Sequence, residues 1–482
     1  MNFTQRFAVL SVVLVAYVVS GCAGYAGAVK DMRSALLAGN KERALKKVNK
    51  ALDVGEPDEL PDKVKGYDSL LLLERATIKQ GLEQHKSSAV DFRASDKHLE
   101  LLDLKNDTMG NIGKFLFSDD STVYKAPAYE KLLLNTLNLL NYLAQYDLEG
   151  ARVEARRMRV MQEYLADEES EQDAVLGLGS YLAGFTFEMS GKAEQALQHY
   201  DEALSRESYP SLSGPIRRLA GCTSYSTERL DSIIGPSVTP ASPVSDESTD
   251  GSAPKEQAVT TSPARTCHLK PPGKGTILVV STVGLAPHKV ARRIPIGAAI
   301  VIAGALLGAM QTAQAQRFAA KGLLTWINFP TMEKTPERFS RTSTSIDGHV
   351  IRTESGLNVA EQVIKAWDSI KGKLMVAAIT RMITRLIAGT ATEEAIKAAG
   401  GNGIGALFAG LAVQGALTAA DTPDTRSWTT LPSKIFIARS EVPAGKHEIK
   451  VVFEGKLGRY VITKTVKVAE GGFVVVPMAS MR

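Results

Sequence analysis

The side chains that could do chemistry in this chain are scattered along it. Seven histidines occur in 482 residues. No two of them stand three or four positions apart, the spacing that places two metal ligands on one helix face, and none adjoins a CxxC pair. A GxSxG nucleophile motif is absent, because Ser180 has a leucine two positions before it. The sequence therefore predicts no metal site, no cofactor and no catalytic residue, and we expect a protein that is not an enzyme.

Two further motifs favour a structural role. Gly401-Asn402-Gly403-Ile404-Gly405-Ala406 loosely matches the GxGxxA dinucleotide fingerprint, but an alanine-rich helix pattern, not a strand, comes before it. We interpret the motif as a turn followed by small residues that allow close helix packing. Asp119 and Asp120 are adjacent, so their side chains diverge, and a solvated loop is the expected setting.

Cys22 is the residue with the clearest chemical role. It follows an uncharged apolar run, residues 7–19, which is typical of a secretory signal and too short to span a membrane. Val19-Ser20-Gly21-Cys22 resembles the bacterial lipobox, which implies cleavage directly before the cysteine and acylation (palmitate) of its thiol. Ala23 comes next, which in the resembled class favours the periplasmic face of the outer membrane. The alternative is an ordinary signal peptide with an incidental cysteine.

The mature chain is weakly basic. Removing residues 1–21 takes away only Arg6, so the formal net charge falls from +5 to +4. That balance argues against a nucleic-acid-binding protein, which would concentrate basic side chains on one face. The remaining cysteines are Cys222 and Cys267. An oxidising periplasm would allow them to pair, and two free thiols are the alternative.

The chain is expected to be α+β, and its composition changes along its length. Residues 236–265 are rich in Ser, Thr and Pro and contain no aromatic residue, so they cannot bury enough apolar surface to fold. We expect a lipoprotein signal peptide at 1–21, a TPR-like helical domain at 22–222, a disordered linker at 223–267, a mixed α/β region at 268–430 and an antiparallel β module at 431–482. The linker should let the two halves unfold independently.

Residues 180–204 carry the spacing of a tetratricopeptide (TPR) repeat. Small residues would let two helices approach, aromatic residues would fill the space between them, and a glycine would make the turn. These positions are Gly184, Phe187, Gly191, Ala196, Tyr200 and Ala203. Partial matches near Gly39, Ser88 and Tyr142 predict a degenerate helical solenoid over residues 27–210. The alternative is an irregular helical bundle with one TPR-like hairpin.

Two surface features could contact a partner. The ridge formed by Arg152, Arg156, Arg157 and Arg159 is typical of a solvated face with internal ion pairs, and binding of an acidic partner or of lipid headgroups is the alternative. Residues 294–310 are uncharged, rich in Gly and Ala, and at the lower length limit for a membrane span. We expect this apolar helix to be covered by protein. The alternative is a helix in or on the lipid bilayer.

Three segments resemble one known group. DTRSWTTLPSKIFIARSEVPAGKHEI (424–449), GLAPHK (284–289) and the YEK…LNYL…ARVEARR stretch are similar to those of uncharacterised bacterial outer-membrane lipoproteins with TPR-like N-terminal halves. The resemblance covers most of the mature chain except the linker and residues 294–325. It implies the architecture and the envelope location, and it implies no activity.

These observations predict a lipid-anchored outer-membrane protein that faces the periplasm and binds an envelope protein or peptide. The favoured function is a scaffold or adaptor, for example in regulating a peptidoglycan synthase or an envelope assembly machine, by analogy with other lipoproteins. The alternative is an oligomeric secretion or export component in which residues 294–321 come together at the membrane. Both hypotheses leave open whether the chain forms a homo-oligomer.

Overall fold

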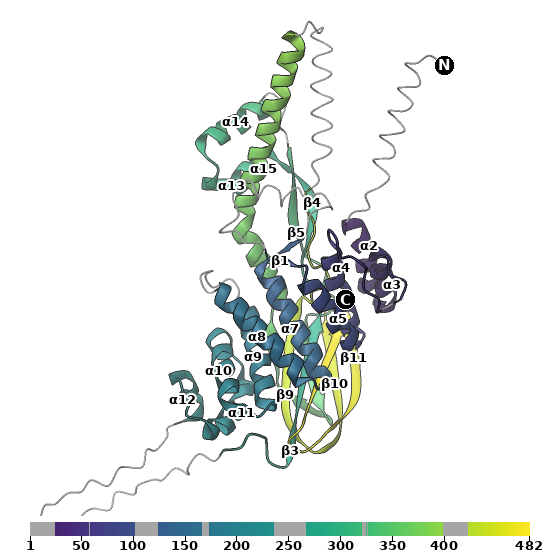
Figure 1. The fold of residues 1–482 in the computed structure, drawn as a ribbon, viewed down its shortest axis with the longest axis vertical. Coiled ribbons are helices and arrows are strands. Elements are labelled where there is room, and N and C mark those ends of the chain that lie inside the picture. Colours follow the sequence, from purple (N-terminus) through teal and green to yellow (C-terminus); the bar gives the residue numbers. More distant parts are fainter. Residues whose placement is uncertain are drawn as a thin grey trace, which may run out of the picture.

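The computed structural model describes most of the chain from Tyr25 to the C-terminus (Figure 1). The described residues are 25–56, 58–101, 124–165, 173–235, 267–320, 324, 326–398 and 423–482. The predicted features that lie outside them are the signal peptide with Cys22, the linker interior at 236–265, Asp119 and Asp120, and the motif at 401–406.

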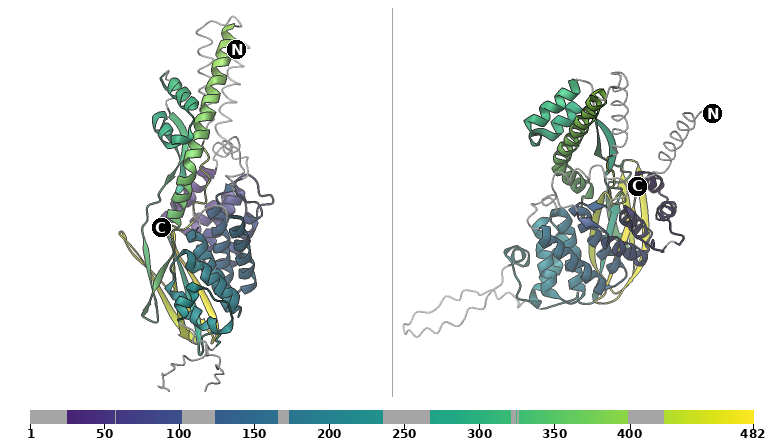
Figure 2. Two further views of the ribbon diagram at one scale, coloured as in Figure 1. Left: turned by 90° about the vertical axis from the view of Figure 1, so that its left-hand side faces the viewer. Right: turned by 45° about the horizontal axis from the view of Figure 1, so that its top comes forward.

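The N-terminal part is helical, as predicted, and its helices pack in consecutive pairs joined by short turns (Figures 1 and 2). The pairs are α2 (Tyr25–Leu37) with α3 (Lys41–Ala51), α4 (Asp68–Gly81) with α5 (His85–Asp96), α7 (Ala128–Ala144) with α8 (Leu148–Leu165), and α9 (Asp173–Met189) with α10 (Ala193–Arg206). Gly39 and Gly191 make turns at φ +81° and +73°, a conformation that glycine adopts without strain. Neighbouring pairs also contact one another.

Shorter elements complete this part of the chain. They are β1 (Glu100–Leu101), β2 (Lys125–Ala126), η1 (Pro210–Leu212), α11 (Ser213–Leu219), η2 (Ala220–Cys222) and α12 (Glu228–Ile234). The Thr227 hydroxyl caps α12 by accepting a hydrogen bond from the Leu230 amide at 3.3 Å, and the Leu230 side chain is buried. The predicted linker therefore began too early, because residues 223–235 contain a helix that packs against its neighbours.

The C-terminal half contains two four-stranded sheets, with strand orders β12-β3-β9-β8 and β11-β10-β6-β7. Their strands are β3 (Lys274–Val283), β6 (Arg341–Ile346), β7 (His349–Ile351), β8 (Thr353–Leu357), β9 (Lys434–Pro443), β10 (Gly445–Gly455), β11 (Gly458–Val468) and β12 (Phe473–Ser480). Four of these strands lie in the predicted β module at 431–482, but they do not form a module of their own. The last strand, β12, pairs parallel with β3, and β10 pairs with β6, so strands from residues 274–357 complete both sheets.

The alternation of side chains along the strands explains why the sheet β12-β3-β9-β8 is covered on both faces. Leu278 and Val280 of β3 belong to the core shared with the helices, whereas Ile277 and Val279 point into the core between the two sheets. Successive strand residues point to opposite faces. The result is a layer of helices, a central sheet and a second sheet.

The two halves of the chain therefore share one hydrophobic core. Residues from α2 to α11 and residues from β3, β8, β9 and β12 belong to the same buried cluster. Helices α4 and α7 contact β12, and α9 contacts β8. The expectation that the two halves unfold independently is wrong for this arrangement, because separating them would expose apolar faces of both.

An arm projects from one end of this body (Figures 1 and 2). It consists of the two-stranded ribbon β4 (His288–Pro295) and β5 (Trp326–Glu333), the segments α13 (Ile296–Ala303), η3 (Gly304–Leu306) and α14 (Ala309–Ala320), and the long helix α15 (Val359–Ala398). The prediction that residues 294–310 form one apolar helix is therefore wrong. The first residues of this segment end β4, and Gly304, at φ +54°, breaks the helix.

Candidate functional site

The inner face of the helix pairs is filled by a segment of the same chain, residues 424–433. The Trp428 amide donates a hydrogen bond to Glu130 at 3.0 Å. The amides of Thr429 and Thr430 donate to the two oxygens of Glu74 at 2.7 and 2.8 Å. Both carboxylates are buried, so these bonds satisfy backbone groups that water cannot reach.

The Trp428 side chain anchors this segment between the helices. Its indole N–H donates to the hydroxyls of Thr77 at 3.0 Å and Thr430 at 3.1 Å. The ring lies edge-on to Phe92 with the ring centres 5.8 Å apart, and the side chain is 1% exposed. A buried tryptophan with a satisfied N–H contributes both apolar burial and position.

Burial raises the pKa values of the two carboxyl groups that hold the segment. It raises the pKa of Glu130 to about 7, although the Trp428 amide and the Tyr124 hydroxyl oppose the rise. Burial also raises the pKa of Glu74, against hydrogen bonds from Thr430, Tyr25 and Thr429. These groups accept hydrogen bonds from backbone amides in the interior.

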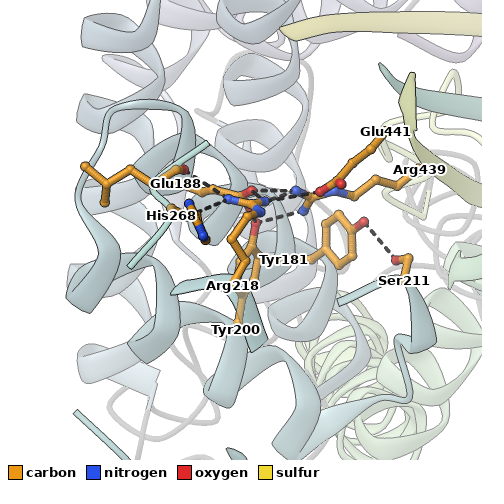
Figure 3. Close-up of polar contacts among 9 residues, drawn as sticks. Tyr181, Glu188, Tyr200, Ser211, Arg218, His268, Arg439 and Glu441 are labelled. Atoms are coloured by element: carbon orange, nitrogen blue, oxygen red, sulfur yellow. Dashed lines mark hydrogen bonds and ion pairs between the residues drawn. The ribbon is translucent and has the colours of Figure 1, made fainter. Parts of the chain in front are cut away.

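A second polar network joins the helices to the central sheet (Figure 3). Arg439 of β9 donates to both oxygens of Glu188 on α9, at 2.7 and 2.8 Å. Arg218 of α11 donates to Glu188 at 2.5 Å and to Glu441 of β9 at 3.3 Å. The Tyr200 hydroxyl donates to Glu188 and accepts from Arg439 at 3.0 Å. One carboxylate of the helical half is thus bound to two guanidinium groups and a phenol.

The charges in this network compensate for the burial of Glu188. Burial alone would raise its pKa, but the positive charges of Arg439 and Arg218 lower it below its ordinary value. Glu188 and Arg439 are both buried. This network therefore acts as a structural connection between α9 and β9, with a large penalty for removing one partner.

An open pocket lies where the arm meets the body. Its volume is about 520 Å³, and its walls come from α2, from β4, from the segment after β5 and from residues 425–429. Four cationic side chains line the pocket, namely Lys30, Arg33, Lys289 and Lys334. The carboxylate among the lining residues is Glu333. Burial and the charge of Arg33 lower the pKa of His288 to about 4, so this histidine is neutral at pH 7.

The pocket wall is rigid on the side of Arg33. This buried guanidinium donates to the Thr429 carbonyl oxygen at 2.5 Å and to the Thr335 hydroxyl at 2.8 Å. Lys30 and Lys334 are exposed, and Lys289 is half-buried. Glu333 forms an ion pair with Arg292 of β4 at 2.6 Å. Because the Glu333 charge is already paired, we expect the pocket to attract anionic groups.

The predicted TPR positions lie together between α9 and α10. Gly184 packs against the Tyr200 ring so closely that a Cβ atom would overlap it. Phe187 stacks on His199 with ring centres 5.1 Å apart. The positions Ala196, Tyr200 and Ala203 are fully buried. These residues serve the packing of one helix pair, and they form no opening.

The other predicted residues have structural settings. Cys222 and Cys267 form a disulfide with their Cα atoms 4.5 Å apart, which ties the end of η2 to the residues before β3. Arg152 pairs with Glu149 at 2.5 Å, and Arg159 pairs with Glu163 at 3.3 Å. Arg157 pairs with Glu154 and Asp96, at 3.2 and 3.5 Å, and Arg156 is exposed. The arginine ridge on α8 is thus largely occupied by ion pairs at the surface.

The part of the chain that the structure describes contains neither a metal-binding cluster nor a membrane-spanning helix. Among the described residues, no group of three or more His, Cys, Asp or Glu side chains is arranged to hold a metal ion. Within the same ranges, no helix combines the length and the apolarity needed to cross a bilayer.

Comparison with known proteins returned no match: no family model, no curated protein and no solved structure is similar to this chain at a significant level.

Proposed function

We propose that this protein is an outer-membrane lipoprotein, anchored through Cys22 and facing the periplasm, that acts as a scaffold or adaptor for an envelope protein. The proposed partners are a peptidoglycan synthase or an envelope assembly machine. Support comes from the lipobox-like start and from the helix pairs, which we interpret as a degenerate TPR-like solenoid. In this proposal the molecule binds a partner and performs no reaction.

The observation that carries this proposal is the basic pocket at the neck of the arm. The inner face of the helix pairs, where a TPR-like protein would hold a peptide, is already occupied by Trp428 and its neighbours. The pocket is open, and four cations line it. We therefore propose that it receives an acidic segment of the partner protein, whose carboxylates would pair with Lys30, Lys289 and Lys334.

Charge reversal in the pocket tests this proposal. The triple variant Lys30→Glu, Lys289→Glu, Lys334→Glu is expected to reduce partner capture from detergent-solubilised envelopes about tenfold or more, since three partly exposed ion pairs contribute about 0.2–1 kcal/mol each and their charges become repulsive. Captured proteins are quantified by mass spectrometry after cross-linking.

A matched control carries the same charge change away from the pocket. Lys446, Lys450 and Lys467 are exposed residues of β10 and β11, and their replacement by Glu should leave capture unchanged. Equal loss of the partner with both triple variants would show a general charge effect. Full retention by the pocket variant would contradict the proposed site.

We propose as the alternative that the protein is an oligomeric secretion or export component at the outer membrane. A different observation favours this function. The arm presents exposed apolar side chains beyond the body, including Val301, Leu306 and Met310. Copies that assemble through their arms would place residues 294–321 side by side. Electron microscopy of the detergent-extracted protein distinguishes the two: rings of this chain favour the export component, and single copies with a captured partner favour the scaffold.

A further inference from the structure

The imidazole ring of His447, in β10, lies between two hydrogen-bond acceptors. Its Nδ1 atom is 2.6 Å from a carboxylate oxygen of Asp347, and its Nε2 atom is 2.8 Å from the carbonyl oxygen of Pro443. A carbonyl oxygen and an ionised carboxylate can only accept hydrogen bonds. Because a neutral imidazole carries a single N–H, both contacts are hydrogen bonds only when the ring is doubly protonated and positively charged.

Asp347 is held in the ionised state that this arrangement requires. Its second oxygen accepts a hydrogen bond from the Glu448 amide at 2.8 Å, and its side chain is 45% exposed to water. The hydrogen bonds from His447 and from the Glu448 amide lower the pKa of Asp347 below its ordinary value. In return, the hydrogen bond to Asp347 raises the pKa of His447, although burial of the ring opposes the rise.

These contacts join three segments at one end of the sheet β11-β10-β6-β7. Asp347 and Gly348, at φ +51° and +80°, form the turn between β6 and β7, and Pro443 ends β9. An aspartate adopts a positive φ less readily than glycine does, so the contacts of its side chain help to hold this turn. The outer strand β7 pairs with β6 at three positions, and the contacts of His447 add to this small number.

The other charged groups near His447 do not replace this ion pair. They are Lys446 and Glu448 of β10, Lys467 of β11, His349 of β7, Glu441 of β9 and Lys274 of β3. Those on β10 and β11 are exposed on the opposite face of the sheet, because successive strand residues alternate. Glu441 pairs with a guanidinium of the helical half, and the residues on β3 and β7 are exposed. Asp347 is therefore the charged group that acts on the ring.

We propose that His447 is a pH-sensitive clamp, which holds the turn at Asp347 and Gly348 against the end of β9 while its ring carries both protons, and which releases the turn when one proton is lost. A neutral ring would place a nitrogen lone pair against either the carboxylate or the carbonyl oxygen, so one of the two contacts must open. The clamp shares no residue with the neck pocket, and this inference does not rest on the proposed partner.

The clamp is expected to hold within a window of pH. The pKa of His447 is raised, so its contribution to stability is complete below the ordinary histidine value of about 6.5 and is lost as the pH rises through the folded-state value. The pKa of Asp347 is lowered, so its contribution is complete above the ordinary aspartate value of about 3.9 and is lost as the pH falls through the folded-state value.

Magnetic resonance of the detergent-extracted protein with isotope-labelled histidine tests the charge of the ring. The ring nitrogen signals distinguish a doubly protonated imidazole from its neutral forms, and the variant His447→Gln assigns the signal. We expect the ring to be mainly doubly protonated at about pH 6.5, where an ordinary imidazole is half protonated. In Asp347→Asn the ring should titrate at lower pH than in the parent, while the turn persists because asparagine tolerates a positive φ.

Hydrogen exchange of the Glu448 amide, which donates to Asp347, shows whether the turn is held. Protection is measured below and above the titration of His447 and corrected for the intrinsic effect of pH on exchange. Loss of the proton is expected to reduce protection about threefold to tenfold, as for a partly exposed ion pair. His447→Gln should show the low protection at both pH values. His349→Gln removes the neighbouring exposed histidine and should keep the behaviour of the parent.

Three results would overturn the inference. The first is a His447 ring that is mainly neutral at about pH 6.5, and the second is a titration that Asp347→Asn leaves unchanged. The third is a loss of protection with rising pH that is the same in the parent and in His447→Gln, because another group would then control the turn.

Discussion

Replacing Glu188 by Gln is expected to destabilise the entire chain by about 3–5 kcal/mol, the cost typical of breaking a buried ion pair. The variant leaves Arg439 buried without its carboxylate partner, and it removes one of the two counter-charges of Arg218, which also pairs with Glu441. The loss should appear as a lower urea midpoint, with helix and sheet signals shifting together, because Glu188 joins α9 to β9.

Two comparisons sharpen this prediction. Glu163→Gln removes an exposed pair with Arg159 and should change stability by less than about 1 kcal/mol. The double variant Glu188→Met, Arg439→Met should be more stable than Glu188→Gln, since no uncompensated charge remains between the two elements. An unchanged urea midpoint for Glu188→Gln would show that the helices and the sheet do not depend on this network.

Replacing Trp428 by Ala is expected to cost about 3–5 kcal/mol, as for other fully buried aromatic side chains. The change removes a side chain that packs on Phe92, and it leaves the Thr77 hydroxyl without its indole partner. Because Trp428 lies in the C-terminal half and contacts α4 and α5, both halves should lose stability together.

Trp326→Ala is the matched control for this prediction. Trp326 is 46% exposed on the arm, so its removal should change the free energy of unfolding by about 1 kcal/mol or less. Urea unfolding followed by circular dichroism and by the remaining tryptophan fluorescence provides both values. Two separate transitions in the Trp428→Ala variant, with the helical one unshifted, would contradict the shared core.

The local elements could be predicted from the sequence to a large extent. The spacing of Gly184 and Tyr200 indicated a close helix pair, and the structure places the glycine against the tyrosine ring. Residues 431–482 were predicted to be β structure, and they contain the strands β9 to β12. These local elements depend on residues a few positions apart in the sequence, and the periodicity of apolar residues shows this spacing directly.

The assembly of these elements could not be predicted. Periodicity shows that a strand has an apolar face, but it does not show which element covers that face. The parallel pairing of β12 with β3 joins residues almost 200 positions apart, and nothing local indicates it. The Ser/Thr/Pro-rich composition of residues 236–265 predicted a disordered linker between two separate halves. Composition does not show whether the segments before and after a linker pack against each other.

The polar residues that connect the halves were missed for the same reason, although two of them left a signal. Glu74 follows four consecutive leucines, and Glu188 stands between Phe187 and Met189. A carboxylate inside an apolar helix stretch requires a buried partner. The sequence could have marked both as interior acids, but their partners, Thr429 and Arg439, lie more than 200 residues away. The basic pocket left no such signal, because its cations come from separate segments.

We infer that residues 424–433 fill the inner face of the helix pairs as part of the core, which leaves the neck pocket for the proposed partner. Hydrogen exchange of this segment in the unmodified protein tests it most directly. The amides of Trp428, Thr429 and Thr430, which donate to Glu130 and Glu74, are predicted to exchange as slowly as those of β3 in the central sheet. Exchange as fast as in the exposed turn at residues 455–458 would show that the segment leaves the helices readily, and it would contradict its placement in the core.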